Sequence, residues 1–162
     1  MKGSNMTDAA TVARHSVSVP LTPERAYDLF VDQFDAWWPK GSHTTTADVA
    51  AVLLEARADG RWGELDGQGG FSPWGRVLAA DRPRRLLLAW QLDPEFKFDP
   101  DRAMQTEVEV TFEPEGDVST RVTLEHRGFE VWGERGAAMR DSVASEGGWT
   151  ELLRLYAQLA GR

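Results

Sequence analysis

The sequence predicts an α+β fold: a curved antiparallel sheet of six to seven strands wrapped around a long C-terminal helix, with two short helices after the first strand. Hydrophobic and polar residues alternate in a series of short segments, as in strands with one buried face, and turn residues such as Asp59-Gly60 join segments into hairpins. Helical spacing of apolar residues is confined to the two ends of the chain, and this segregation is typical of α+β domains.

The first strand and the helices after it are predicted from residues 14–38. Residues 14–19 alternate, and Pro20 ends the strand. Thr22 suits the N-cap of a helix, and Pro23 suits its first turn. An apolar face then recurs at helical spacing, formed by Ala26, Tyr27, Phe30 and Phe34.

Three pairs of segments are predicted to form the remaining strands. They are residues 49–57 with 61–66, 75–81 with 84–92, and 106–112 with 120–126. The last pair alternates most regularly. Its first strand places Val108, Val110 and Phe112 on one face, and its second places Val122, Leu124 and His126 on one face.

The chain ends in a segment that predicts a long amphipathic helix, residues 142–162. Its apolar face should cover the concave side of the sheet. Gly147 and Gly148 interrupt this pattern, since each destabilises a helix interior by roughly 1 kcal/mol relative to alanine. Either they mark a close approach to the sheet or a gap beside a ligand, or the helix simply begins at Trp149.

The composition excludes several classes of function. The net charge of -8, from 26 acidic and 18 basic residues, disfavours nucleic acid and anionic membranes as partners. The absence of cysteine excludes disulfides, thiolate catalysis and sulfur-ligated metal. No apolar stretch is long enough to span a membrane. We therefore expect a cytoplasmic protein, with no nucleic acid and no membrane among its partners.

One domain is expected over residues 7–162. Residues 1–6, which end at a second methionine, Met6, are expected to be a disordered remnant of a cloning vector. The acidic residues 93–101 contain two prolines and lack the spacing of a calcium loop, so they predict a solvated turn. No cofactor and no metal are predicted.

Four segments together resemble a known family. They are VPLTPERAYDLFVDQFDAWWP, GRVLAADRPRRLLLAWQL, VEVTFEPEGDVSTRVTLEHRGF and GGWTELLRLYAQL. Their order resembles the START-like (SRPBCC, birch-pollen-allergen-like) helix-grip superfamily. Within it, they are similar to the bacterial proteins related to the activator of the heat-shock-protein-90 ATPase. The resemblance implies a seven-stranded sheet that grips a helix, with a hollow between them that accepts a hydrophobic ligand in many relatives.

The adjacent tryptophans Trp37 and Trp38, followed at once by proline, are the first candidate site residues. Neighbours in a helix point in different directions, so one indole should face something other than the main core. With the family resemblance, we expect one ring to pack inward and the other to rim the hollow. The alternative, that both rings plug the end of the core, has equal weight. The other aromatic candidates are Trp62, Trp74, Trp90, Phe112 and Trp149.

Two histidines complete the candidate ligand-binding residues. His126 falls on the strand face that meets the long helix, where it could bind a ligand oxygen or act as an acid or base. A histidine bonded to neighbouring protein groups is more common, and we favour that interpretation. His43 lies in a loop and is expected to be exposed. A metal site combining both with a carboxylate lacks any supporting spacing, and no catalytic motif is present.

Three functions follow as hypotheses. The first is a carrier or sensor that encloses a small hydrophobic or aromatic molecule between sheet and helix. The second, implied by the resemblance, is a co-chaperone-like domain of the stress response that contacts a chaperone. The third, also implied by the superfamily, is a cyclase or hydrolase that acts on an aromatic or polyketide-like substrate. A homodimer through an exposed sheet edge is left open.

Overall fold

A computed structural model describes residues 12–39 and 49–161, and the structural statements below refer to these residues. The predictions for residues 1–6 and for His43 lie outside them. Seven antiparallel strands form one sheet in the order β1-β7-β6-β5-β4-β3-β2. The strands are β1 (Ala13–Val19), β2 (Val49–Leu54), β3 (Arg61–Asp66), β4 (Phe71–Asp81), β5 (Arg85–Trp90), β6 (Thr106–Pro114) and β7 (Thr120–Arg127).

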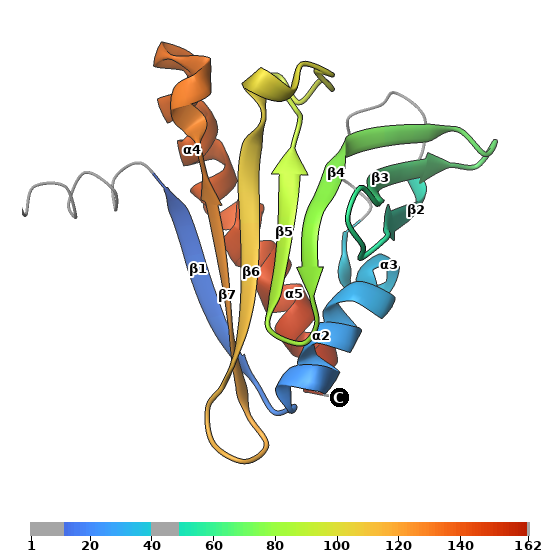
Figure 1. Ribbon diagram of the computed structural model, residues 1–162, viewed down its shortest axis with the longest axis vertical. Helices are drawn as coiled ribbons and strands as arrows, with labels where there is room; N and C mark the ends of the chain where they lie inside the picture. The colour runs from blue at the N-terminus through green and yellow to red at the C-terminus, as the bar shows by residue number, and fades with distance from the viewer. Residues whose placement is uncertain (1–11, 40–48, 162) are drawn as a thin grey trace, which may run out of the picture.

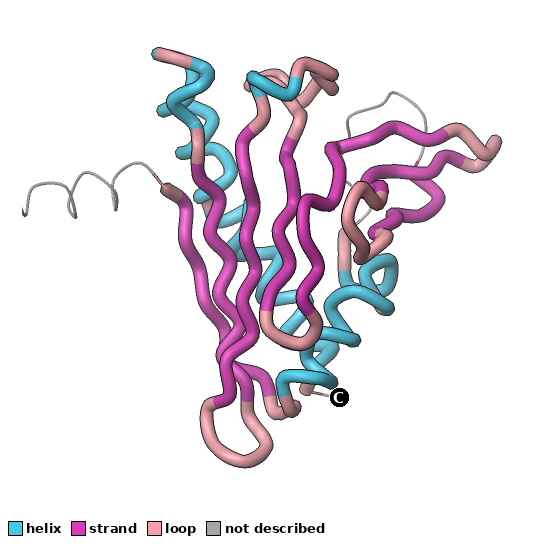
Figure 2. Tube along the Cα trace, viewed as in Figure 1, coloured by secondary structure: helices cyan, strands magenta, loops and turns pink. Residues whose placement is uncertain are grey.

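The helices lie on one side of this curved sheet, so the predicted α+β architecture is confirmed (Figure 1). In Figure 2 the strands form one layer and the helices run behind it. The helices are α2 (Pro23–Asp32), α3 (Phe34–Trp37), α4 (Glu134–Ala144) and α5 (Glu151–Ala160), with short 3-10 turns at Arg102–Met104 and Phe129–Trp132.

The helix α2 begins where the sequence predicts it. The Thr22 side chain accepts a hydrogen bond from the Arg25 N–H, and Pro23 occupies the first turn. Tyr156 of α5 is fully buried and donates its hydroxyl to the Ala26 carbonyl at 2.8 Å. This bond ties the C-terminal helix to α2.

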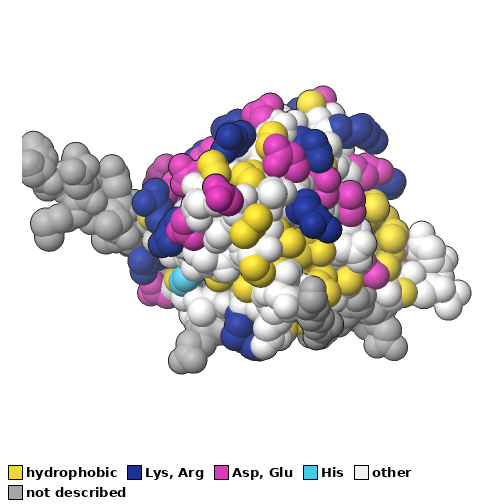
Figure 3. Space-filling model, turned by 90° about the horizontal axis from the view of Figure 1, so that it is seen from below, with side chains coloured by type: hydrophobic (Ala, Val, Ile, Leu, Met, Phe, Trp, Pro, Cys, Tyr) yellow, Lys and Arg dark blue, Asp and Glu magenta, His cyan; other side chains and the backbone are white. Residues whose placement is uncertain are grey.

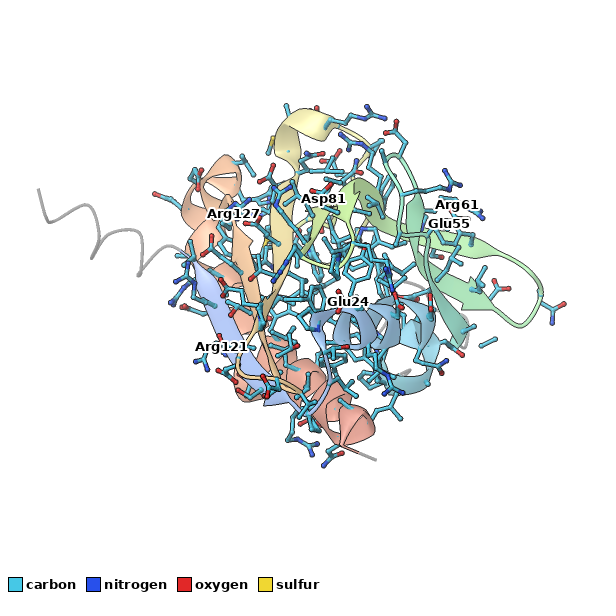
Figure 4. The ribbon with its side chains drawn as sticks, turned by 60° about the horizontal axis from the view of Figure 1, so that its bottom comes forward. Glu24, Glu55, Arg61, Asp81, Arg121 and Arg127 are labelled. Atoms are coloured by element: carbon cyan, nitrogen blue, oxygen red, sulfur yellow. The ribbon has the colours of Figure 1, made fainter. Side chains whose placement is uncertain are left out.

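The two faces of the sheet differ as the alternation predicts. The predicted inward residues of β6 and β7 are buried, whereas the outer face carries charges. On that face Arg127, labelled in Figure 4, contacts Glu109 at 2.7 Å and Glu107 and Glu125 at 3.2 Å. Arg85 of β5 pairs with the same Glu109. The network therefore links three neighbouring strands across the face that meets solvent.

A second ion pair fixes the turn between β2 and β3. Arg61 donates to Glu55 from its Nε at 3.1 Å and from its Nη2 at 3.0 Å, and the two residues lie together in Figure 4. These hydrogen bonds, together with one from the Arg61 backbone N–H, lower the pKa of Glu55 to about 2.

The C-terminal helical segment is bent at Gly148. Between α4 and α5 lies a π turn, Glu146–Thr150, in which Gly148 has the non-helical angles φ −95° and ψ −129°. A Cβ at Gly148 would lie 2.1 Å from the Val143 carbonyl oxygen. Gly148 therefore lies close to the end of α4 and not to the sheet, and α5 begins at Glu151, two residues after the start at Trp149 that we considered as the alternative.

The lower end of the molecule combines apolar and charged side chains (Figure 3). A groove of about 400 Å³ lies there between α2 and the end of α5, with Leu21, Leu29 and Leu159 beside Arg25 and Asp28 in its wall. Among the described residues, no helix is long and apolar enough to cross a membrane.

Candidate ligand site

Five indole rings meet in a closed cycle between the sheet and the helices. Successive ring centroids are 4.9, 5.4, 5.9, 5.7 and 6.0 Å apart, and each residue is at most 7% exposed. We call this set the indole cluster. Its members, in the order of contact, are Trp38, Trp74, Trp62, Trp90 and Trp149.

Each ring comes from a different element. Trp38 follows α3, Trp62 lies on β3, Trp90 ends β5, and Trp149 lies at the bend between α4 and α5. Trp74 is the extra residue where the register between β3 and β4 shifts, because Trp62 pairs with Gly75 while the next residue of β3 pairs with Pro73. A bulge of this kind redirects a side chain, and here it accompanies the entry of Trp74 into the cluster.

Trp62 is held against the sheet by a close backbone approach. Its Nε1 donates to the Ala89 carbonyl at 3.0 Å. Gly75 lies beside this bond, and a Cβ there would be 1.8 Å from the same oxygen and 3.0 Å from the indole nitrogen. A glycine is therefore required at this point of β4 for the strand and the ring to meet.

The adjacent tryptophans after α2 are both buried, and their ring centroids lie 5.7 Å apart. Trp37 packs against Phe30 at 4.8 Å and Tyr156 at 5.6 Å, and its Nε1 donates to the Phe30 carbonyl at 3.0 Å. It belongs to the central core. Trp38 instead contacts Trp74 and Trp149. It is 7% exposed, so its ring lies inside the protein and does not rim an open hollow.

His126 is fully buried beside the cluster, and both of its ring nitrogens are bonded. Trp149 Nε1 donates to His126 Nδ1 at 3.0 Å, which leaves the histidine proton on Nε2. Nε2 then donates to Thr106 Oγ1 at 2.7 Å. Burial lowers the pKa of His126 to about 3. The ring is therefore neutral at pH 7 and orients Trp149, which fits the structural interpretation that we favoured.

Glu64 is a candidate site residue that the sequence pattern did not indicate. Its side chain is 1% exposed, and its Oε2 accepts a hydrogen bond from Trp74 Nε1 at 2.7 Å. A carboxylate is rarely buried so completely in a protein core. The sequence does indicate on which side of the sheet it lies. Glu64 is two residues after Trp62 on β3, so the alternation of side chains in a strand places both on the same side of the sheet.

The loop between β5 and β6 covers one side of the cluster. Phe96 has the left-handed angle φ 63° and places its ring 6.5 Å from that of Trp90. The Asp93 carboxylate holds this turn by accepting from the Glu95 and Lys97 N–H groups, each at 2.9 Å. A non-glycine residue in this conformation is strained by about 1 kcal/mol or more.

Phe112, which we predicted to bind a ligand, lies elsewhere. It is buried in the central core, 5.2 Å from the Tyr27 ring and 5.8 Å from the Phe30 ring. In the part of the chain that the structure describes, no group of three or more His, Asp and Glu residues is arranged to hold a metal ion.

A seven-stranded antiparallel sheet that encloses a C-terminal helix defines an α+β domain of the helix-grip class. The family model described as activator of Hsp90 ATPase homolog 1-like protein matches residues 20–161. The chain belongs to this family, and the resemblance inferred from its sequence is confirmed. No curated protein matches the sequence.

Solved structures agree with this assignment. The chain is similar to CalC, a self-sacrificing resistance protein from Micromonospora echinospora, with 30% identity, a TM-score of 0.68, and coverage of 93% of this chain and 94% of CalC. It is also similar to the anthrahydroquino-γ-pyrone synthase Txn09, with 29% identity, a TM-score of 0.63, and coverage of 92% and 96%. A protein from Mesorhizobium loti, 17% identical with a TM-score of 0.64, covers 91% of this chain and 95% of its own and shows the fold alone.

Proposed function

We propose that the protein binds a planar aromatic molecule at the indole cluster. The observation that supports this proposal is the convergence of five indoles from five separate parts of the chain, one of which, Trp74, donates to the buried carboxyl group of Glu64. A carboxyl group is rare in a core that serves packing alone, because its removal from water is costly.

The energetics favour an aromatic ligand over an aliphatic one. An indole pair contributes about 0.5–1.5 kcal/mol beyond its buried area, so a ligand that parts two rings must replace their contact. A flat aromatic ligand restores that contact on both of its faces, whereas an alkyl chain does not. Burying about 300 Å² of ligand surface gives roughly 7 kcal/mol before association costs, an upper limit that corresponds to a dissociation constant of about 10 µM.

The test is binding of fluorene, a planar tricyclic hydrocarbon, to protein labelled with 5-fluorotryptophan. Equilibrium dialysis gives the dissociation constant, and ¹⁹F NMR shows which indoles sense the ligand. We expect saturable binding that shifts the resonances of Trp74, Trp90 and Trp149, each assigned through its own Trp→Phe variant.

Trp132 provides the internal control, because its ring lies outside the cluster and packs under the Arg135 guanidinium at 5.7 Å. Its resonance should not move. Absence of saturable binding, or shifts confined to Trp132, would show that the cluster is only a packing core.

An enzyme is the second candidate, and Glu64 is the observation in its favour. His126 is a poor general base, since its pKa of about 3 is far from neutral and both of its nitrogens are engaged. Glu64 is buried and bonded to Trp74 of the cluster, and Txn09, 29% identical, is a synthase. The class of reaction that this supports is proton abstraction next to the carbonyl of an aromatic ketone.

The enzyme hypothesis can be tested without knowing the natural substrate. In D2O, the protein should accelerate exchange of the α-hydrogens of 2-tetralone, followed by ¹H NMR, and Glu64→Gln should abolish the acceleration. An equal rate with Glu64→Gln, or a rate no faster than buffer, would remove Glu64 as a base and leave the binding proposal standing.

We also propose three properties apart from ligand binding: contact with a chaperone, a homodimer through a sheet edge and a cytoplasmic location. The first rests on the description of the family alone. Co-purification with a chaperone and the mass of the particle in solution would test the first two.

A further inference from the structure

The indole N–H groups of the cluster divide into two kinds. Three have acceptors within the protein: Trp62 bonds to Ala89, Trp74 to Glu64 and Trp149 to His126. The N–H groups of Trp38 and Trp90 are buried, and neither has an acceptor in the part of the chain that the structure describes.

Two such donors in one site are unusual. Most buried side-chain polar atoms in proteins have a hydrogen-bond partner, because a desolvated donor without an acceptor is costly. The cluster supplies acceptors to its other three donors at 2.7–3.0 Å, so nothing about its packing prevents ordinary bonding. An acceptor from outside the protein would therefore gain the most binding free energy by accepting a hydrogen bond from one of the two remaining donors.

The two donors belong to rings that share a neighbour. Trp38 and Trp90 both contact Trp149, with ring centroids 6.0 and 5.7 Å from it. The Trp149 ring cannot turn freely, because His126 holds its Nε1. A flat ligand that packs against Trp149 therefore comes into reach of both neighbouring indoles.

We propose that the N–H groups of Trp38 and Trp90 recognise oxygen acceptors, carbonyl or phenolic, on the planar aromatic ligand. This inference rests on the proposed function and names the chemical class of the ligand. The two donors give the site a preference that ring packing alone does not supply, because a hydrocarbon of the same shape leaves both N–H groups buried without an acceptor.

The experiment compares fluorenone with fluorene, which have the same planar skeleton and differ in a carbonyl against a methylene group. Dissociation constants are measured by equilibrium dialysis for the unmodified protein. They are measured again for two forms in which Trp38 or Trp90 is replaced by benzothienylalanine, whose sulfur takes the place of the indole N–H while the ring shape is kept. The same replacement of Trp132 is the matched control, because its N–H is also buried with no acceptor among the described residues but lies outside the cluster.

Fluorenone should bind at least fivefold more tightly than fluorene to the unmodified protein and to the Trp132 control. The preference should fall below twofold in at least one of the two cluster replacements, while the affinity for fluorene changes by less than twofold. Equal affinity for the two compounds in the unmodified protein would overturn the inference and leave aromatic binding intact, as would a preference that survives both replacements. If neither compound binds, the proposed function fails and the inference falls with it.

Discussion

Replacing His126 by glutamine should remove much of the loss of stability that the protein suffers between pH 7.5 and pH 5. In the folded protein His126 is neutral, with a pKa of about 3, whereas in the unfolded chain the pKa is near 6.5. A base whose pKa is depressed by folding contributes its full stability above pH 6.5 and loses it as the pH falls toward 3. Between pH 7.5 and pH 5 the free energy of unfolding should therefore fall by about 2 kcal/mol through this residue alone.

The assay is urea unfolding followed by far-ultraviolet circular dichroism at both pH values. The His126→Gln protein should be less stable at pH 7.5, because the bonds to Thr106 and Trp149 are disturbed, but its fall on acidification should be about 2 kcal/mol smaller. His15→Gln is the control. Burial also lowers the pKa of His15, but that side chain is only partly buried, so its replacement should change the fall in stability less than His126→Gln does. An unchanged fall in the His126 variant would refute the argument that burial keeps this ring neutral.

Two further substitutions test the C-terminal helices. Gly148→Ala should destabilise the protein by about 1–3 kcal/mol, because its Cβ would lie 2.1 Å from the Val143 carbonyl, whereas Gly67→Ala, where nothing lies within 4 Å, should be nearly neutral in thermal unfolding. Tyr156→Phe should cost about 1 kcal/mol in the free energy of unfolding, since the hydroxyl bond to Ala26 is lost; a cost below about 0.3 kcal/mol would show that this bond does not tie α5 to α2.

The sheet was predictable because its signals are local. Alternation over residues 106–112 and 120–126 places the buried residues of β6 and β7 correctly, and the Thr22-Pro23 pair marks the start of α2. The helix α4 was missed, because only Gly136, Met139 and Val143 of its eleven residues are buried. Glycine adds no apolar side chain, so two apolar residues are too few to show helical periodicity. A helix that lies mostly in solvent leaves little hydrophobic periodicity in the sequence.

The candidate site was predictable in its residue types but not in its geometry. The choice of tryptophans followed from their number, but the burial of both Trp37 and Trp38, with ring centroids 5.7 Å apart, did not follow from their adjacency. That Trp74 joins the cluster depends on a register shift between β3 and β4, which no single-strand pattern reveals. Glu64 was overlooked because an acidic residue in a strand is ordinarily assigned to the solvent face.

The closeness of the five indoles has an optical consequence. Rings whose centres are 4.9–6.0 Å apart exchange electronic excitation, so light absorbed by one tryptophan is shared by its neighbours before it is emitted. A single quencher or a single displaced ring would then dim the emission of the whole set, and coupled transitions would give the folded protein strong near-ultraviolet dichroism bands. The protein thus contains a native chromophore array at the place where we expect its ligand.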